Sequence, residues 1–296
     1  MSNKLKKSNK NILVIGLGLI GASLCRALKD GKKYEKIIGH DSNEEVMDYA
    51  IKKDYVDEIE YNLKNSIQKS DIIIFCVPVK EINKILDSAS NFFNTEKIFT
   101  DTLSTKNIIK KYFKDNDIEN INNFIFSHPM AGTENYGIKN SQADLFKNAT
   151  VLVSPLTKNK LITTNNKNFE CINDFWKSID CNVSKINDYD HDEILAAFSH
   201  VPHFISFSLS KILKDSKSYN FQDFPWAYPN KGSLSDMLRI ANSDAEAWAN
   251  IFSSNSSQIQ NFLNNYILEL EKLKLLINKK DTDELISYLK KSKPLK

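Results

Sequence analysis

The chain of 296 residues has little of what marks several large classes of protein. Its four cysteines form no CxxC pair, which argues against a zinc site or a disulfide framework and indicates reduced thiols in a cytoplasmic protein. No apolar run approaches the roughly 18 residues needed to cross a bilayer. The net charge is only +3, which argues against nucleic acid as the main partner. We therefore expect no membrane, no nucleic acid and no metal among its ligands.

Glycine is also scarce, and its placement is informative. Three of the eight glycines lie in one short loop, Gly16-Leu-Gly-Leu-Ile-Gly21, between an apolar run at Asn11–Ile15 and a helical pattern. Such a loop turns tightly, lets the backbone approach a pyrophosphate and lets the helix pack on the strand, with the phosphates at the helix N-terminus. The loop residues predicted to contact a dinucleotide are Gly16, Gly18, Leu19, Ile20 and Gly21.

An acidic residue follows at the distance that such a loop requires. A second apolar run, Ile37–Gly39, ends close to Asp41, which lies twenty residues after Gly21. A carboxylate there accepts hydrogen bonds from the adenosine ribose and repels a 2′-phosphate. The sequence therefore favours NAD over NADP.

Strand and helix patterns alternate over the first part of the chain. The strongest strand pattern, Asp71–Val79, reads DIIIFCVPV, and apolar runs of this kind are typical of strands buried on both faces. From Asp188 onward nearly every segment has helical periodicity. Gln258–Lys274 carries an apolar stripe wide enough to contact a second helical layer, which this chain or a second chain could supply. We predict a Rossmann-type doubly wound α/β sheet over residues 1–187, followed by an all-helical substrate and dimerisation domain over residues 188–296.

Polar residues follow several of the predicted strands. In open α/β sheets, ligands bind beyond the carboxyl ends of the strands. Val77 and Pro78, Asp101 with Ser104, and His128 all fall at this edge. An imidazole there can accept a proton while a hydride leaves, although His128 could equally only end its strand. Ser104 could bind a substrate hydroxyl, cap the following helix, or do both.

Three of the five histidines fall within thirteen residues, which raises the question of a metal site. His200 and His203 can share a helix face, but His191 is out of phase with them and is expected to point away. Pro202 removes a backbone donor, so a helix here should bend or begin afresh. We expect a histidine-bearing helix that forms a wall of the substrate site.

Arginine is rare in this chain, since nearly all of its 40 basic residues are lysines. One of the two arginines, Arg239, stands in the apolar context MLRIANSD. A planar guanidinium in that setting suits a bidentate grip on a carboxylate, and a structural ion pair is the alternative.

Taken together, these segments resemble the prephenate/arogenate dehydrogenase family of tyrosine biosynthesis. The motifs that carry the resemblance are GLGLIG at Gly16–Gly21, DTLSTK at Asp101–Lys106, SHPMAGTENYG at Ser127–Gly137, HDEILAAFSHVPH at His191–His203, and the pair Arg239 and Trp248. The resemblance implies a Rossmann domain, a helical domain that forms a homodimer, and NAD-dependent oxidative decarboxylation of prephenate or arogenate.

The resemblance also implies roles for single residues. His128 would take the proton of the substrate hydroxyl, with support from Ser104, while Arg239 and His203 would contact the substrate carboxylates. Thr133 and Glu134 would line the entrance. Gly232 matches the family pattern, although its flanking residues do not. The sequence does not separate prephenate from arogenate as the substrate.

Two other functions compete with this interpretation. A β-hydroxyacid dehydrogenase would also place a Rossmann domain before helices, but it usually needs a lysine on the first helix of the second domain. The first lysine after His203 is Lys211, beyond the expected wall. A non-catalytic NAD-sensing module would leave His128, Ser104 and Arg239 without a role.

Overall fold

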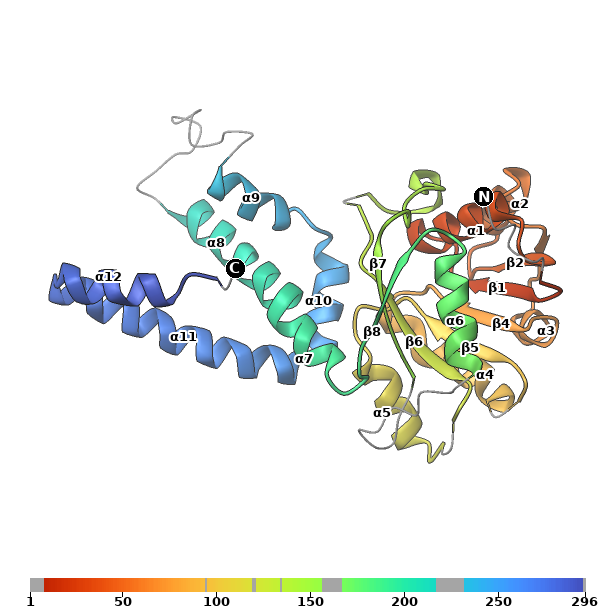
Figure 1. Ribbon diagram of the computed structural model, residues 1–296. Helices are drawn as coiled ribbons and strands as arrows, with labels where there is room; N and C mark the ends of the chain where they lie inside the picture. The colour runs from red at the N-terminus through yellow and green to blue at the C-terminus, as the bar shows by residue number, and fades with distance from the viewer. Residues whose placement is uncertain are drawn as a thin grey trace, which may run out of the picture. The chain divides into compact units, whose positions relative to one another are not determined.

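The computed structural model describes residues 8–93, 95–118, 121–133, 135–155, 167–216 and 232–294 (Figure 1). Within these residues, eight strands form one sheet in the order β3-β2-β1-β4-β5-β6-β7-β8. The strands are β1 (Asn11–Ile15), β2 (Lys36–His40), β3 (Glu58–Ile59), β4 (Ile72–Phe75), β5 (Ile98–Asp101), β6 (Phe124–Pro129), β7 (Thr150–Pro155) and β8 (Asn182–Lys185). All neighbouring strands are parallel except β6 and β7. The predicted mostly parallel sheet is confirmed.

Helices cover both faces of the sheet because the central strands are apolar on both sides. Ile12 and Val14 belong to the core cluster under α1 (Leu19–Gly31), α2 (Glu44–Lys52) and α6 (Lys167–Lys177). Leu13 and Ile15 belong to the opposite cluster, under α3 (Leu63–Gln68), α4 (Ile82–Ala89) and α5 (Asn107–Asp115). Short 3₁₀ turns lie at Val79–Glu81, Ser90–Phe92 and Ile138–Asn140. This is the doubly wound arrangement that the continuous apolar runs predict.

The chain divides into two structural units, and it passes between them three times. The first unit is Met1–Leu195 with Asn242–Ser254, and the second is Ala196–Ala241 with Asn255–Lys296. The boundary expected from the sequence lies between residues 187 and 188. In the division into structural units, α7 (His191–Leu195) belongs to the first unit, and its His191 and Asp192 are buried. Helix α10 (Ala245–Ser254) returns to the first unit, where Ser254 Oγ lies 2.9 Å from Thr105 Oγ1.

In its described residues the second unit is helical, as predicted. It contains a π-helix (Ala196–His200), α8 (Val201–Asp215), α9 (Ser233–Ile240), α11 (Ser256–Lys279) and α12 (Thr282–Lys291). Helix α8 directly follows the π-helix, and Pro202 lies in its first turn, a position that tolerates a missing backbone donor. No described helix is long and apolar enough to cross a membrane.

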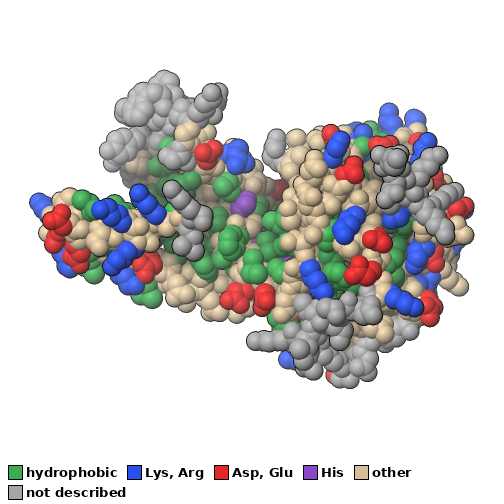
Figure 2. Space-filling model, viewed as in Figure 1, with side chains coloured by type: hydrophobic (Ala, Val, Ile, Leu, Met, Phe, Trp, Pro, Cys, Tyr) green, Lys and Arg blue, Asp and Glu red, His purple; other side chains and the backbone are tan. Residues whose placement is uncertain are grey.

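Helix α11 leaves large apolar side chains in contact with solvent, and Figure 2 shows apolar side chains at the surface of this unit. At least two fifths of each of these side chains is exposed: Phe262, Ile267, Leu268, Leu270, Leu275 and Ile277. Apolar residues so closely spaced on one helix are more than the scattered exposure of an ordinary surface and are typical of an interaction site.

A buried ion pair holds the carboxyl ends of β5 and β6 together. The backbone pairing of these strands ends at Thr100 and Ile125. Beyond it, the Lys106 ammonium contacts the Asp101 carboxylate and donates to Ser127 O at 2.8 Å. The same carboxylate accepts the main-chain N–H of Ser127 at 3.2 Å. Both side chains are essentially inaccessible to water, so the pair replaces the missing ladder at the point where β6 reaches His128.

We predict that Lys106→Met destabilises the protein by about 3–5 kcal/mol, because it leaves a carboxylate buried without its partner. Urea denaturation followed by circular dichroism measures the loss. Lys84→Met is the matched control, since the Lys84 side chain is 77% exposed and pairs with Glu81 in water. An unfolding midpoint of Lys106→Met equal to that of the control would contradict the prediction.

Candidate active site

In the glycine loop between β1 and α1, packing within the protein leaves no room for a side chain at two of the glycines, whereas the third has open space beside it. Gly16 has φ +91°, and a Cβ there would lie 2.7 Å from Cys76 O and 3.1 Å from Val77 Cγ1. A Cβ on Gly21 would lie 1.8 Å from Gly16 O. A Cβ on Gly18, the N-cap of α1, would meet nothing within 4 Å. Gly18 therefore borders open space at a helix N-terminus, which is the geometry of an anion-binding loop.

The Asp41 carboxylate is hydrogen-bonded to the backbone of this loop. Its carboxylate accepts the main-chain N–H of Leu17 at 2.7 Å and that of Asn43 at 2.9 Å. Because Leu17 lies inside the loop, the predicted acid and the predicted loop form one site. Val77 borders Gly16 from the end of β4, and Pro78 next to it is exposed. These residues can therefore hold the adenosine half and the pyrophosphate of a dinucleotide.

His128 occupies β6 beside the end of the strand, and its side chain is nearly buried. Its Nδ1 lies 3.1 Å from His191 Nε2 on α7. Behind it, the Ser127 hydroxyl accepts Trp176 Nε1–H at 2.9 Å and lies 2.7 Å from Thr100 Oγ1. The strand that carries the imidazole is therefore fixed from behind by hydrogen bonds as well as by the Asp101–Lys106 pair.

A carboxylate continues the contact beyond His191. Asp192 Oδ1 lies 2.7 Å from His191 Nδ1. The carboxylate also accepts the main-chain N–H groups of Lys106 and Asn107, both at 2.8 Å, at the start of α5. Asp192 thus caps a helix that has no side-chain cap of its own. The sequence does not reveal this role: it indicates Ser104 as the possible cap and predicts that His191 points away from the other two histidines.

The surroundings of His191 and Asp192 determine the protonation states of these two side chains. Burial lowers the pKa of His191, and the hydrogen bond to Asp192 only partly opposes this. Burial alone would raise the pKa of Asp192, but the bond from His191 and the two N–H donors hold it below its ordinary value. Near neutral pH, Asp192 is therefore ionised and His191 is neutral.

Ser104 and Asp101 differ in their surroundings. Ser104 is half-buried in the segment between β5 and α5, on the carboxyl side of the sheet, as predicted. The Asp101 side chain is fully buried, and Lys106, Leu103 N and Ser127 N occupy its carboxylate. Burial raises the pKa of Asp101 and lowers that of Lys106, and their contact opposes both shifts. The Asp101 side chain, which the sequence predicts to bind the cofactor, holds the ends of β5 and β6 together in this structure.

The second unit brings together two of the predicted substrate contacts. His203 on α8 is half-buried, and its Nδ1 lies 2.8 Å from Ser199 O. Burial lowers the pKa of His203, and the positive charge of Arg239 on α9 lowers it further. Arg239 is exposed and makes no ion pair with any described residue. Gly232 caps α9 with φ +118°, in the region that favours glycine.

The remaining predicted residues are placed as follows. Thr133 is half-buried, and its hydroxyl accepts the N–H of Asn135 at 3.2 Å. Glu134 lies outside the described residues. His200 is buried, with Nδ1 3.0 Å from Asn255 Nδ2. Among the described side chains, no group of three histidine, cysteine or acidic residues could hold a metal ion.

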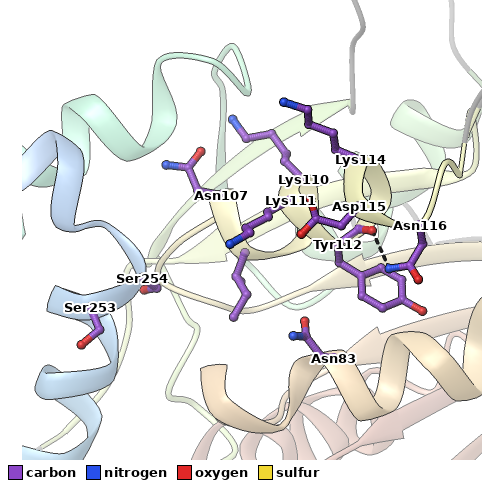
Figure 3. Close-up of a pocket in the computed structure, with 11 residues that line it drawn as sticks. Asn83, Asn107, Lys110, Lys111, Tyr112, Lys114, Asp115, Asn116, Ser253 and Ser254 are labelled. Carbon is purple, nitrogen blue, oxygen red and sulfur yellow. Dashed lines mark hydrogen bonds between the residues drawn. The ribbon is translucent and has the colours of Figure 1, made fainter.

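A separate pocket of about 890 Å³ lies beside α5 in the first unit (Figure 3). Lys110, Lys111 and Lys114 of α5 line it, with Ser253 and Ser254 of α10. Of the described residues that we predict for the active site, none lines this pocket. Its basic wall is a feature of the surface of α5.

The chain has clear relatives. The model of the prephenate dehydrogenase nucleotide-binding domain matches residues 24–185, and that of the prephenate dehydrogenase dimerization domain matches residues 187–291. The cyclohexadienyl dehydrogenase of Zymomonas mobilis is 30% identical over 285 residues, which cover 96% of this chain and 94% of the relative.

Two solved structures are similar to it over nearly their whole length. Prephenate dehydrogenase from A. aeolicus, in complex with hydroxyphenyl propionate and NAD⁺, is 25% identical, with a TM-score of 0.81 over 96% of each chain. Arogenate dehydrogenase from Synechocystis is also 25% identical, with a TM-score of 0.78 over 95% of this chain and 97% of the other.

Proposed function

The chain belongs to the prephenate dehydrogenase family, and we propose on that premise that it catalyses the NAD-dependent oxidative decarboxylation of prephenate, arogenate or both. The observation that carries the proposal is a nearly buried imidazole, His128, at the carboxyl side of a sheet that also bears a dinucleotide-binding loop. Family membership favours this reaction over that of a β-hydroxyacid dehydrogenase and over a non-catalytic NAD sensor.

In this reaction the substrate loses a hydride and carbon dioxide and its ring becomes aromatic, while the hydroxyl proton leaves only transiently. The glycine loop and Asp41 would hold NAD, which would supply the acceptor for the hydride from the carbon that bears the hydroxyl. His128 takes the hydroxyl proton as the hydride leaves, and Ser104 supports the same oxygen, directly or through water. Loss of the ring carboxylate then leaves a phenolate oxygen, to which His128 can return the proton. A base positioned in this way contributes roughly a hundred- to ten-thousand-fold in rate.

The residues of the first unit fit NAD. The open space at Gly18 and the N-terminus of α1, with Leu19 and Ile20 in its first turn, suit the pyrophosphate. Asp41 is held against the loop, where its remaining lone pairs can accept the ribose hydroxyls and its charge disfavours NADP. Val77 borders Gly16 of the same loop, and Pro78 beside it is exposed, so both are assigned to the cofactor site.

The second unit supplies candidates for recognition of the substrate carboxylates. Arg239 offers an exposed guanidinium with no ion pair to a described residue, and its charge acts on His203. A planar guanidinium binds a carboxylate through two parallel hydrogen bonds. We assign Arg239 and His203 to the substrate carboxylates, and Thr133, Glu134 and Gly232 to the walls around the substrate.

We further propose a homodimer in the cytoplasm, in which α11 contributes to the interface. The family model that covers residues 187–291 describes a dimerization domain, and α11 carries closely spaced exposed apolar side chains. Burying such side chains between two chains stabilises the pair by roughly 25 cal/mol for each Å² removed from water.

The test of the reaction is NADH formation with prephenate and arogenate offered separately at equal concentration. We expect turnover with at least one of them, and a loss of roughly a hundred- to ten-thousand-fold in kcat for His128→Asn, because the base is gone. NAD binding and substrate binding, measured by calorimetry, should remain close to wild type. Turnover by wild type with neither substrate, or full activity of the variant, would contradict the proposal.

The glycine loop gives a second test, in which two similar substitutions separate folding from cofactor binding. Gly18→Ala meets only open space, so its unfolding midpoint should equal that of wild type while its NAD affinity falls, because the methyl group occupies the pyrophosphate position. Gly21→Ala meets Gly16 O and should itself cost about 1–3 kcal/mol of stability. Unchanged NAD affinity in Gly18→Ala would refute the placement of the pyrophosphate.

The homodimer is tested by sedimentation equilibrium at micromolar concentration, where wild type should show twice the chain mass of 33.9 kDa. Leu268→Lys combined with Leu275→Lys places two charges on one exposed face of α11, since residues seven apart share a helix face. This variant should sediment as a monomer. Asn265→Lys, an exposed polar position of the same helix, is the control and should remain a dimer. Monomeric wild type would overturn the proposal.

A further inference from the structure

We propose that His191 and Asp192 are positioning residues that fix the tautomer of His128, so that Nδ1 carries the proton and Nε2 keeps the lone pair that accepts the substrate proton. The inference rests on the proposed function, in which His128 is the base. It assigns a role to two buried residues that the reaction as described above does not use.

The first step is the polarity of the Asp192 contacts. The carboxylate receives the N–H groups of Lys106 and Asn107, and these amides can only donate. An ionised carboxylate can only accept, so the contact of 2.7 Å with His191 Nδ1 requires a proton on that nitrogen. The opposite arrangement would set the lone pair of Nδ1 against the carboxylate oxygen at the same distance.

The second step concerns which nitrogen donates in the hydrogen bond between His191 and His128. A neutral imidazole with its proton on Nδ1 has an acceptor at Nε2. The distance of 3.1 Å between His191 Nε2 and His128 Nδ1 is a hydrogen bond only if His128 Nδ1–H donates. His128 then holds its own lone pair on Nε2. The three side chains thus form an ordered line from the N-terminus of α5 to the base.

The third step concerns the protonated state. When His128 accepts a proton at Nε2, its Nδ1–H becomes a charge-assisted donor to His191. The negative charge of Asp192 lies at the far end of the same line. Lys106 and Asp101 also act on His191, but they carry opposite charges and contact each other. The Asp192 carboxylate thus contributes to stabilising the imidazolium.

Asp192→Asn is the decisive substitution because it keeps the shape and reverses the polarity. The asparagine oxygen can still accept Asn107 N–H, which lies 2.8 Å from Oδ2, and Lys106 N–H, which lies 3.1 Å from it. The amide nitrogen then faces His191 Nδ1 as a donor. The His191 proton then moves to Nε2, so His128 Nδ1 must accept the hydrogen bond between the two rings. The His128 proton is consequently on Nε2, the nitrogen that needs a lone pair to accept the substrate proton.

We expect kcat of Asp192→Asn to fall by roughly a hundred- to ten-thousand-fold, the contribution of a positioned general base, with KM for NAD and for substrate within a few-fold of wild type. A loss of about ten-thousand-fold is known for a catalytic histidine held in the wrong tautomer. Asp281→Asn is the matched control. Asp281 also caps a helix, accepting Asp283 N–H at 3.1 Å and Glu284 N–H at 3.0 Å. Its substitution should leave kcat unchanged.

A spectroscopic measurement tests the tautomer directly and needs no active variant. In ¹⁵N-histidine spectra of the wild-type protein near neutral pH, the signals that disappear in His128→Asn should show a protonated Nδ1 and an unprotonated Nε2. In Asp192→Asn the two nitrogens should exchange roles. If Asp192→Asn does not fold, the wild-type spectrum alone decides.

Each outcome separates the two proposals. Loss of activity in both His128→Asn and Asp192→Asn, with the expected tautomer, supports both. Loss in His128→Asn with wild-type kcat in Asp192→Asn, or a wild-type His128 that carries its proton on Nε2, overturns the positioning role and leaves the proposed reaction standing. Full activity of His128→Asn overturns the proposed base, and with it this inference.

Discussion

The site depends on one buried lysine, because Lys106 serves two networks at once. Its ammonium contacts Asp101 and the Ser127 carbonyl, which fixes the end of β5 to β6 one residue before His128. Its main-chain N–H donates to Asp192, which fixes α7 and His191. Lys106 therefore sets the distance between His128 and its partner from both sides. A buried ion pair with every polar atom engaged is costly to assemble, but it admits few alternative geometries.

Much of the first unit follows from local patterns in the sequence. Continuous apolar runs predict strands buried on both faces, and the loop Gly16–Gly21 with Asp41 predicts the dinucleotide site, because each feature depends on neighbours in the chain. The positions of His128 and Ser104 follow from the same rule about strand ends. The contacts of Asp192 do not, because a cap supplied by a residue 85 positions away has no local signature.

The boundary between the two units also depends on packing that local sequence patterns do not reveal. Helical periodicity is continuous from Asp188 to beyond Pro202, so the sequence assigns His191 to the helical domain. The structure passes from one unit to the other inside this stretch, between α7 and the π-helix Ala196–His200. A π-helix interrupts the regular side-chain period and is often found near functional sites. Periodicity identifies the helix, but it does not show which end packs on the sheet.

A neutral imidazole between carboxylate and base has an electrostatic consequence. Opposite charges 4 Å apart attract by about 4 kcal/mol at an effective dielectric constant of 20. A carboxylate in direct contact with His128 would therefore favour the protonated imidazole more strongly than a carboxylate that acts from behind His191. An intervening ring roughly doubles the separation and halves this energy to about 2 kcal/mol. His191 thus passes on the orientation set by Asp192 while it weakens the attraction between the Asp192 carboxylate and a protonated His128.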